Sequence, residues 1–530
     1  MPEIKKVELQ KLNDLSEIKK YRFFSDWPIV YILNNKNEAY IGESHNFYSR
    51  IKQHKEDQDK KRLTSVQVIS DEFFNKSATL DIESSLIQYM AADGKFLIQN
   101  KNSGLKDHSY YDKERYGDLF EKIWERLVDE GFAQHTLGEI KNSDLFKYSP
   151  YKKLTDEQLF IARRICNEIQ LIKENTYIIN GQPGTGKTIL AIYLFKYLSE
   201  KDDTKHMKIG LVVPMTSLRK TIKDVFGNIK GLKKKMVIGP NDVIKEKYDL
   251  LIVDEAHRLQ RRRNITNIGA FDIVNEKLNL SKTATQLDWV MQAAPNRIFF
   301  YDKNQSIKPA DVRPEDFQKI NAKEETLHLQ MRIKNGLDYY EAIDNFFELN
   351  NQRVDSFEHY DFRIYDSLSP MINQIKERNK SKGLSRMVAG YAWPWHTKND
   401  NNEKGYDIDV DGLKLIWNST AKGWVNSPNA INEIGCIHTV QGYDLNYVGV
   451  IIGPEFSYDF KKNKFIVNKE HYFDINGHKG ISDISELEGY IKNIYKTLLT
   501  RGIEGTYLYI VDHSLRKYFK DVFSGSDFLY

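Results

Sequence analysis

Short apolar runs alternate with longer helical patterns over the last two thirds of the chain. The runs cover residues 177–179, 208–213, 248–254, 296–301, 387–391, 447–452 and 506–511. Strands that are apolar on both faces, and that are separated by helices, belong to parallel sheets covered by helices on both sides. The pattern therefore predicts an α/β architecture with parallel sheets for this part of the chain.

The first hundred residues show a different and smaller pattern. Alternating and apolar stretches predict strands at residues 28–33, 38–43 and 96–100. An amphipathic helix is predicted at 81–90, residues 1–25 are charged and mildly helical, and one more helical stretch covers 119–128. We therefore expect a small α+β domain that is followed by a helical connector.

Length, charge and cysteine content narrow the class of protein. At 530 residues the chain is too long for one core, so roughly two to four domains are expected. The 78 Lys and Arg residues against 74 Asp and Glu give a net charge of +4, which neither requires nor excludes nucleic acid. No apolar run is long enough for a membrane span, and the first residues lack a signal peptide's apolar segment. With Cys166 and Cys436 as the only cysteines, we expect a cytoplasmic protein without a disulfide framework or cysteine zinc site.

A glycine-rich turn between a strand and a helix carries the strongest local signal. The sequence Gly-Gln-Pro-Gly-Thr-Gly-Lys-Thr at 181–188 fits the phosphate-binding pattern G-x-x-x-x-G-K-[ST] in its required strand–loop–helix context. Backbone N–H groups of such a loop and the N-terminus of the following helix bind phosphate oxygens, the lysine reaches the outer phosphates, and the threonine holds Mg²⁺. The motif predicts a nucleoside-triphosphate site that is formed by Gly181, Gly184, Gly186, Lys187 and Thr188.

One carboxylate ends the apolar run at 248–254, and a second carboxylate directly follows it. Asp254 and Glu255 begin the sequence Asp-Glu-Ala-His-Arg, and the carboxyl end of a strand is where Mg²⁺·nucleotide chemistry is expected. Asp254 is the predicted metal carboxylate, and Glu255 is the predicted base for the attacking water. Two acidic residues after a strand also occur in ordinary turns, but the phosphate loop favours the catalytic interpretation.

An ordered set of residues in the first domain resembles the signature of the GIY-YIG nuclease family over about residues 27–105. The set comprises Tyr31, the Tyr40-Ile-Gly strand, Asn46, Arg50, His54, Glu83 and Asn100. One departure is present, because Ile29 stands where the first family motif has glycine. The alternative interpretation is a small sheet in which the tyrosines pack and Glu83 is a solvated helix position.

The resemblance implies a Mg²⁺-dependent endonuclease site. Cleavage of a phosphodiester needs a cation on a carboxylate oxygen, a second cation for the phosphorane charge, and a group that deprotonates water. By resemblance Glu83 would hold one Mg²⁺ and Arg50 would stabilise the scissile phosphate. The remaining positions would position or activate water or support the site, namely Tyr31, Tyr40, His54 and Asn100.

Further motifs resemble superfamily 1 helicases over about residues 150–515, with the Schlafen-type group as the nearest variety. They are Asp-Lys-Asn-Gln (302–305), Gln-Met-Arg (330–332), His-Thr-Val-Gln-Gly-Tyr-Asp (438–444) and Leu-Leu-Thr-Arg-Gly (498–502). By resemblance Gln305 senses the γ-phosphate, and Arg332 and Arg501 are arginine fingers from the second lobe. The departures are Tyr301, where glycine is usual, and Asp444, where many relatives have glutamate.

The same resemblance assigns coupling and base-reading roles. Thr439, Gln441 and Gly442 would couple the second lobe to nucleotide and strand, and Gln158 would contact adenine. Gln158 also completes a helix capping box with Thr155, and both roles are compatible. Trp289, Trp393 and Trp395 are candidates for base stacking, although tryptophan more often packs in a core.

Together these observations predict an α/β multidomain protein, with a small α+β GIY-YIG nuclease domain before two RecA-like parallel-sheet lobes. The expected boundaries are an N-terminal extension at 1–26, the nuclease-like domain at 27–105, the connector at 106–150, and lobes at 151–310 and 311–530. We expect an ATP- and Mg²⁺-dependent DNA helicase or translocase with a fused endonuclease, acting in defence against foreign DNA or in repair. DNA, single-stranded or duplex, is the expected partner, and a homo-oligomer or a partner defence protein is possible.

Three alternatives remain open at this point. ATP binding could license the nuclease without strand separation, the first domain could be a non-catalytic binding module on a working motor, or the substrate could be RNA.

Overall fold

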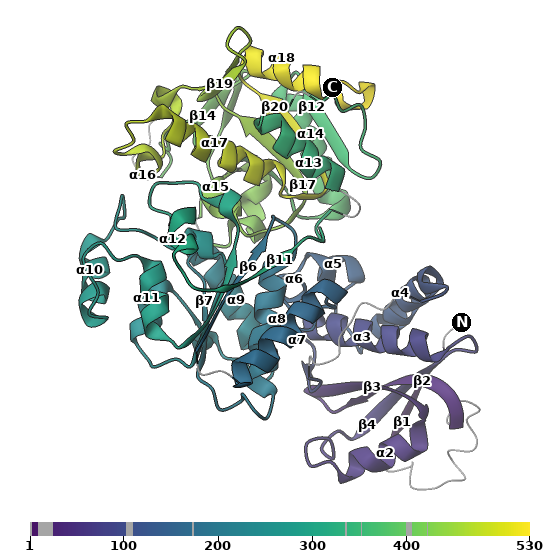
Figure 1. Cartoon of the computed structure of the whole chain (residues 1–530). Coiled ribbons are helices and arrows are strands. Elements are labelled where there is room, and N and C mark those ends of the chain that lie inside the picture. The colour runs from purple at the N-terminus through teal and green to yellow at the C-terminus, as the bar shows by residue number, and fades with distance from the viewer. Residues whose placement is uncertain are drawn as a thin grey trace. The chain divides into compact units, whose positions relative to one another are not determined.

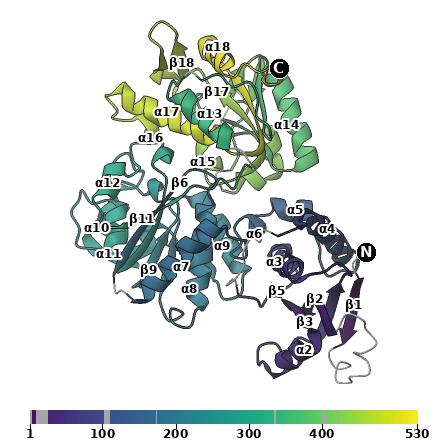
Figure 2. The ribbon, with the colours of Figure 1, turned by 45° about the vertical axis from the view of Figure 1, so that its right-hand side comes forward.

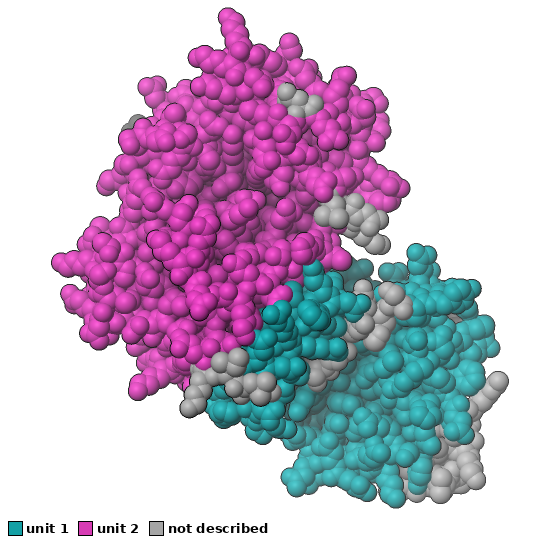
Figure 3. All heavy atoms as spheres, viewed as in Figure 1, with its two compact units in different colours: residues 1–171, 188–207, 222–236 teal, residues 172–187, 208–221, 237–530 magenta. Residues whose placement is uncertain are grey.

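The computed structural model describes residues 3–8, 25–101, 110–171, 174–333, 337–350, 352–398, 405–420 and 422–530. The chain divides into two compact units, which Figure 3 distinguishes by colour. Unit 1 contains residues 1–171, 188–207 and 222–236, and unit 2 contains residues 172–187, 208–221 and 237–530. Each unit is described by itself.

Unit 1 is built on a five-stranded sheet with the order β1-β4-β2-β3-β5. Its strands are β1 (Glu3–Glu8), β2 (Ser25–Asn34), β3 (Glu38–Asn46), β4 (Ser65–Ser70) and β5 (Leu97–Ile98). The pairs β2–β3, β2–β4 and β1–β4 are antiparallel, and β3–β5 is parallel. Ile29, Tyr31 and Leu33 alternate along β2 and pack with Phe47 and Ile51 of the following helix in one buried cluster. Val30 and Ile32, which point to the opposite face, are also fully buried, so β2 is covered on both faces.

The helices of unit 1 begin and end at recognisable caps. The Asn46 side chain accepts from Ser49 N at the start of α2, the Asn75 side chain accepts from Ala78 N at the start of α3, and left-handed Gly94 ends α3. The helices that lie wholly in unit 1 are α2 (Phe47–Glu56), α3 (Lys76–Asp93), α4 (Lys113–Asp129), α5 (Leu137–Asn142), α6 (Asp144–Lys147) and α7 (Asp156–Leu171). Unit 1 also contains α8 (Lys187–Glu200) except its first residue, and the end of α9 (Thr216–Gly227) from residue 222 onward.

The first lobe of unit 2 contains a six-stranded sheet with the order β11-β6-β10-β9-β7-β8, of which Figure 1 labels β6, β7 and β11. All of its strand pairs are parallel. One face packs against α10 (Ile268–Lys277), α11 (Gln286–Ala293) and α12 (Pro314–Gln318) in a single apolar cluster. The strands are β6 (Asn175–Gly181), β7 (Ile209–Val212), β8 (Val237–Ile238), β9 (Leu250–Val253), β10 (Asn296–Tyr301) and β11 (Lys323–Leu327).

The second lobe of unit 2 contains a parallel five-stranded sheet with the order β12-β20-β17-β13-β16. Alternate residues of β17 enter two different clusters, one with α14 and the other with α13, α17 and α18. Figure 2 labels β17 and these four helices. The strands are β12 (Asp361–Tyr365), β13 (Ser385–Ala389), β16 (Ile434–Cys436), β17 (Leu445–Ile452) and β20 (Gly502–Ile510). The helices are α13 (Leu337–Phe347), α14 (Leu368–Lys382), α15 (Ile437–Val440), α16 (Ile475–His478), α17 (Ile484–Leu499) and α18 (His513–Val522).

Two hairpins and several short 3₁₀ turns complete the described part of the chain. The hairpins are β14 (Ile408–Val410) with β15 (Leu413–Leu415), and β18 (Phe456–Asp459) with β19 (Lys464–Val467). The 3₁₀ turns are η2 (Lys234–Met236), η3 (Pro240–Ile244), η4 (Ala256–Arg258), η5 (Lys303–Gln305), η6 (Trp424–Asn426), η7 (Pro428–Asn432), η8 (Lys469–His471) and η9 (Ser526–Phe528). Among the residues described, no helix is both long and apolar enough to cross a membrane.

The α/β fold class is confirmed, but several local predictions are wrong. Residues 3–8 form strand β1 rather than helix, because β1 pairs along its whole length with β4, a strand that the sequence did not predict. Residues 9–24 lie outside the described residues. The first lobe extends past residue 310, since β11 pairs in parallel with β6. Trp289 is fully buried against Phe271 and donates to Asn275, so its ring belongs to the core.

Candidate functional sites

A hydroxyl–imidazole pair forms the centre of the site in unit 1. The Tyr31 hydroxyl and His54 Nε2 share a hydrogen bond of 2.7 Å, and the Tyr40 ring meets the His54 ring edge-on at 5.0 Å between centroids. Gly42 faces this pair from β3, where a Cβ atom would overlap the Tyr31 hydroxyl. The glycine of the Tyr-Ile-Gly strand is therefore required for the close approach of Tyr31 to the backbone.

Burial holds both partners of this pair in their neutral forms. It raises the pKa of the Tyr31 hydroxyl well above its ordinary value, and the neighbouring Tyr40 adds to the effect. Burial also lowers the pKa of His54 to about 4, with further contributions from the positive charges of Lys60 and Arg50. At neutral pH the His54 imidazole is thus an uncharged hydrogen-bonding group.

Glu83 lies on α3 beside a second carboxylate that the sequence did not single out. Burial first, and then the charge of Glu43, raises the pKa of Glu83 to about 7, while Lys76 and Arg50 act in the opposite direction. Glu43 directly follows Gly42 within β3 and forms an ion pair with Lys76. The two carboxylates and the Arg50 guanidinium are therefore within electrostatic reach of one another.

Three further positions of this site have structural explanations. Asn100 holds the Tyr-Ile-Gly strand in place, because its Oδ1 accepts from Ile41 N at 3.0 Å and its Nδ2 donates to Ile41 O at 2.8 Å. Asn46 is the N-cap of α2, the helix that carries Arg50 and His54. Ile29, which replaces the usual glycine, is fully buried in the same cluster as Tyr31, so the departure is accommodated by packing.

In unit 2, Asp302 joins two of the predicted nucleotide residues. Lys187 Nζ donates to Gly181 O at 2.5 Å and to Gln182 O at 3.0 Å, and it lies 3.3 Å from Asp302 Oδ2. The same Oδ2 atom accepts from Gln305 Nε2 at 2.7 Å. The sequence placed Asp302 in a motif but gave it no role, and only the fold brings it to the phosphate loop.

The phosphate loop lies between β6 and α8 in a conformation that needs glycine. Gly184 and Gly186 have φ angles of +87° and +79°, in the left-handed region that side chains disfavour. The segment after β11 covers the loop: Met331 N donates to Gly184 O at 2.8 Å, and Gln330 Nε2 donates to Pro183 O at 2.7 Å. Thr188 is the second residue of α8 and belongs to unit 1.

The two predicted carboxylates lie at the end of β9 and are almost completely buried. Asp254 is 1% exposed, and Glu255 adopts a left-handed backbone conformation with a φ of 53°. The Glu255 Oε2 atom lies 2.8 Å from His257 Nε2. Burial alone would raise the pKa of Glu255, but the His257, Lys187 and Arg501 charges lower it, so the carboxylate stays ionised.

Of the two predicted arginine fingers, Arg501 is buried and the Arg332 side chain is 9% exposed, and their surroundings differ. Arg332 Nε donates to Asp444 Oδ1 at 2.6 Å and Arg332 Nη1 donates to Thr500 O at 2.9 Å. Although burial opposes it, the Asp444 charge raises the pKa of Arg332. Arg501 donates to the backbone carbonyls of Thr497 and Tyr443 and forms no ion pair among the described residues. Burial and the nearby Arg332 lower the pKa of Arg501 to about 10.

The Gln-Gly-Tyr segment connects the two lobes inside unit 2. Both polar atoms of the Gln441 side chain are buried and have no hydrogen-bond partner in the part of the chain described. Gly442 has a φ of +88°, and a Cβ there would press on Met215 at 2.9 Å. The Tyr443 hydroxyl, which the sequence did not single out, bonds to Thr221 Oγ1 at 2.8 Å and to Ser217 Oγ at 3.1 Å.

Gln158 belongs to unit 1, where it completes the predicted capping box of α7. Thr155 N donates to Gln158 Oε1, and Gln158 N donates to Thr155 Oγ1, both at 3.2 Å. The capping role is confirmed by these contacts, while the adenine role stays a prediction. Trp393 and Trp395 are partly buried against the apolar cluster of α14.

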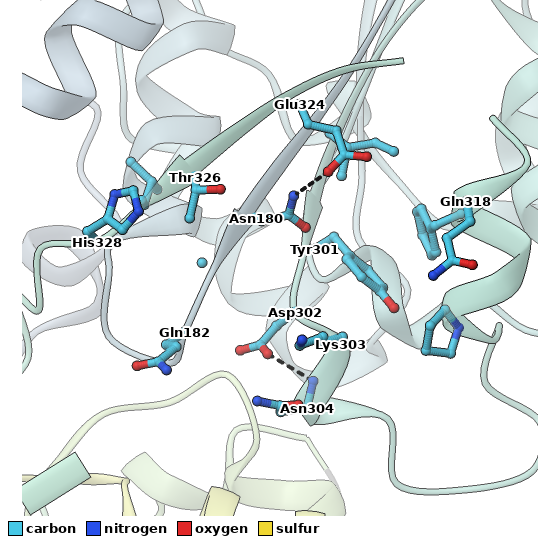
Figure 4. A pocket seen from close by; sticks show the side chains of 15 residues that line it. Asn180, Gln182, Tyr301, Asp302, Lys303, Asn304, Gln318, Glu324, Thr326 and His328 are labelled. Atoms are coloured by element: carbon cyan, nitrogen blue, oxygen red, sulfur yellow. Dashed lines mark hydrogen bonds between the residues drawn. The ribbon is translucent and has the colours of Figure 1, made fainter. Parts of the chain in front are cut away.

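A cavity of about 530 Å³ adjoins the phosphate loop in the first lobe (Figure 4). Tyr301 and Phe317 form part of its wall, with ring centroids 4.1 Å apart, so the residue that replaces a glycine here shapes the cavity. Asn180 and Glu324 are hydrogen-bonded across another wall at 3.2 Å. Because Gln182 and Asp302 also line it, the cavity is continuous with the candidate nucleotide site.

Comparisons with known proteins give relatives for much of the chain. The uncharacterized protein YPL245W of Saccharomyces cerevisiae is 26% identical over 391 residues, which are 64% of this chain and 83% of the relative. Pif1 helicase from Bacteroides, solved with ADP-AlF3 and ssDNA, is 14% identical with a TM-score of 0.28. The match covers 66% of this chain and 91% of the Pif1 chain. Mss116p, solved with ssRNA and AMP-PNP, is 15% identical with a TM-score of 0.34. The match covers 75% of this chain and 76% of the Mss116p chain.

Two family models match separate parts of the chain. The GIY-YIG catalytic domain matches residues 28–94, which contain Tyr31, Tyr40, Arg50, His54 and Glu83. The Schlafen group 3 DNA/RNA helicase domain matches residues 174–512, well over half of the chain. The chain therefore belongs to the Schlafen group 3 DNA/RNA helicase family and carries a GIY-YIG catalytic domain ahead of its helicase domain.

Proposed function

We propose that the chain is an ATP-driven DNA helicase or translocase with a Mg²⁺-dependent endonuclease on the same polypeptide. The observation that carries the motor part is the convergence, within unit 2, of buried Lys187, buried Arg501, largely buried Arg332 and an ionised Glu255. The lysine and the two arginines beside a glycine loop suit a triphosphate, because they supply positive charge where the negative charge of the phosphates is held and redistributed.

The residues of the loop fit ATP and Mg²⁺. Gly184 and Gly186 leave room for a curled backbone whose N–H groups can face phosphate oxygens. Lys187 would hold the outer phosphates, Thr188 and Asp254 would hold Mg²⁺, and Gln158 would contact the base. Bound Mg²⁺ would neutralise charge on the β- and γ-phosphates. Glu255 stays ionised, as a base that accepts a proton from water must be.

The arginines of the second lobe would respond to the phosphates. Arg501 has only carbonyl acceptors among the described residues, so an anion between the lobes would give it the ionic partner that it otherwise lacks. Arg332 would exchange part of its contact with Asp444 for the same anion. Gln305 is hydrogen-bonded to Asp302 and would sense the γ-phosphate. Gln441 and Gly442 would transmit the change to the bound nucleic-acid strand.

For the nuclease part, Glu83 would hold Mg²⁺, which accepts carboxylate oxygens together with water and phosphate. Bound Mg²⁺ would supply a Lewis acid for the phosphate. Arg50 would stabilise the phosphate charge, and Tyr31 with His54 would orient the attacking water through their shared hydrogen bond. Tyr40 would pack against His54, and Asn100 would fix the strand. We assign the activity to defence against foreign DNA or to repair.

The test uses the full chain with two inactivating variants and one control. Plasmid and linear DNA are incubated with Mg²⁺, with and without ATP, and ATP hydrolysis, strand separation and cutting are recorded. Wild type is compared with Lys187→Ala, Glu83→Ala and Lys277→Ala, which removes an exposed lysine of unit 2. We expect Lys187→Ala to lose ATP hydrolysis, Glu83→Ala to lose cutting, and Lys277→Ala to match wild type.

The pattern of results decides between the proposal and its alternatives. Cutting that needs ATP binding while strand separation is absent would favour an ATP-licensed nuclease. Cutting that survives Glu83→Ala would overturn the metal role of Glu83, and no cutting of DNA or of an RNA oligomer under any condition would favour a non-catalytic binding module.

A further inference from the structure

A lysine that belongs to no motif lies against the nuclease residues of unit 1. Lys60 follows α2 in a short turn, and its Nζ atom lies 4.0 Å from the centre of the Tyr40 ring. The Lys60 side chain is only 20% exposed, which is low for a residue type that is normally solvated. A lysine over the face of an aromatic ring is attracted to its π-electrons, so this contact fixes the position of the ammonium group.

The turn that carries Lys60 is held by the backbone and by Asp57. Lys60 N donates to Asp57 O at 3.2 Å, Asp59 N donates to Asp57 Oδ1 at 2.9 Å, and buried Leu63 closes the turn by donating to Lys60 O at 2.9 Å. Lys60 Nζ lies 3.5 Å from Asp57 Oδ2, whose side chain is 39% exposed. The turn therefore keeps its shape without the lysine side chain, and the Asp57 contact is a long and partly solvated one.

Lys60 and Arg50 act together on the same imidazole. Both positive charges contribute to the low pKa of His54, although burial is the larger cause. Burial lowers the pKa of Lys60 itself, with Asp57 opposing this change and Arg50 adding to it. Two cations beside a neutral Tyr31–His54 pair are unfavourable by themselves, and they become favourable when an anion binds between them.

We propose that Lys60 is a second phosphate-binding residue of the nuclease site, which donates to a non-bridging oxygen of the nucleic-acid strand next to the oxygen that Arg50 contacts. This inference rests on the proposed nuclease function. Lysine is a point-charge phosphate ligand with three donors, so it complements a guanidinium that binds in a plane. Lys60 acts by binding alone, and no proton or bond is transferred through it.

The experiment compares three single variants of the full chain. Lys60→Met keeps the aliphatic stem over Tyr40 and removes the charge. Lys61→Met removes the charge of the exposed neighbouring residue and is the matched control. Asp57→Asn keeps the oxygen that accepts from Asp59 N but weakens the ion pair with Lys60. It therefore tests whether Lys60 acts only by stabilising the turn.

Cutting of a duplex oligonucleotide is measured as kcat/KM over a range of salt concentrations. We expect Lys60→Met to lower kcat/KM about tenfold or more and to reduce the slope of log(kcat/KM) against log[salt] by roughly 0.9, the loss of one phosphate contact. Lys61→Met and Asp57→Asn should keep the wild-type slope. An Asp57→Asn variant that reproduces the Lys60→Met loss, or a Lys60→Met variant with unchanged slope, would overturn the inference while leaving the nuclease function intact.

A binding measurement separates this inference from the proposed function. Affinity for the same oligonucleotide is determined in EDTA at several salt concentrations for the wild type and the three variants. If the wild type cuts nothing, the nuclease proposal fails, but a smaller binding slope in Lys60→Met alone would still support the phosphate contact. Equal binding slopes in all four proteins would contradict it.

Discussion

The two candidate sites balance their charges in opposite ways. In unit 1 the central groups are neutral, because burial keeps a proton on Tyr31 and off His54, and a glycine allows their close approach. In unit 2 the central groups are ionised and pair with one another, as Lys187 does with Asp302 and Arg332 with Asp444.

This difference indicates which changes each site tolerates. A neutral cluster depends on shape, since its hydrogen bond and ring contacts require particular separations. A network of buried charges depends on charge balance, because an uncompensated buried ion is costly. Substitutions that alter only charge or only shape should therefore affect the two sites unequally.

The largest effect is expected from removal of the Asp302 carboxylate. Asp302→Ala deprives both Lys187 and Gln305 of a shared acceptor, so the loop lysine loses its ionic partner in the first lobe. We expect ATP hydrolysis to fall by about 10²–10³-fold, the range for loss of one preorganised electrostatic contact. ATP-independent cutting should be unchanged. Asp521→Ala, at an exposed aspartate of α18, serves as the control, and equal hydrolysis in the two variants would contradict the role given to Asp302.

The converse experiment changes shape in unit 1 without changing charge. Gly42→Ala places a methyl group in the position of the Tyr31 hydroxyl, so Tyr31 must move away from His54. We expect cutting to fall by about 10²-fold, as when reacting groups are displaced by about 1 Å, and ATP hydrolysis to be unchanged. Gly117→Ala in α4 is the control, because a Cβ there meets nothing within 4 Å. Full cutting by Gly42→Ala would show that the close approach of Tyr31 is dispensable.

The same contrast explains what the sequence could and could not predict. The phosphate loop was recognisable because its residues are contiguous and glycine at positive φ leaves a pattern. Asp302 and Tyr443 lie in motifs that gave them no individual role, and Lys60 lies in no motif. Their roles depend on contacts with residues distant in sequence or with a ring across a turn.

Strand predictions failed for a related physical reason. β1 is charged and β11 has four consecutive polar residues before Leu327, so neither has the apolar run of a buried strand. Both owe their conformation to pairing, β1 with β4 and β11 with β6. The expected boundary at residue 310 consequently missed the last strand of the first lobe.

A smaller effect is expected when charge is kept but geometry is lost in unit 2. In Arg332→Lys the ammonium group can keep the Asp444 contact, but it cannot also reach Tyr340 and Thr500 as the planar guanidinium does. We expect ATP hydrolysis to fall about tenfold, or about 1.4 kcal/mol in the activation barrier. Arg353→Lys, at an exposed arginine of the same lobe, is the control. A loss as large as that of Asp302→Ala would mean that geometry matters as much as charge there.

The smallest effect concerns protonation of the neutral cluster. Because folding lowers the pKa of His54 from 6.5 to about 4, the unfolded chain binds a proton at this position between these pH values and the folded chain does not. The contribution of neutral His54 to stability is therefore fully present above pH 6.5 and is lost as the pH falls toward 4. With ¹³C-labelled histidine, the resonance that disappears in His54→Gln should titrate near pH 4. In Lys60→Met the midpoint of the His54 titration should rise, because one of the charges that lower the pKa is gone. A midpoint near 6.5 in the wild type would mean that the Tyr31–His54 pair is solvated. Unit 1 would then lack the neutral site that distinguishes it from unit 2.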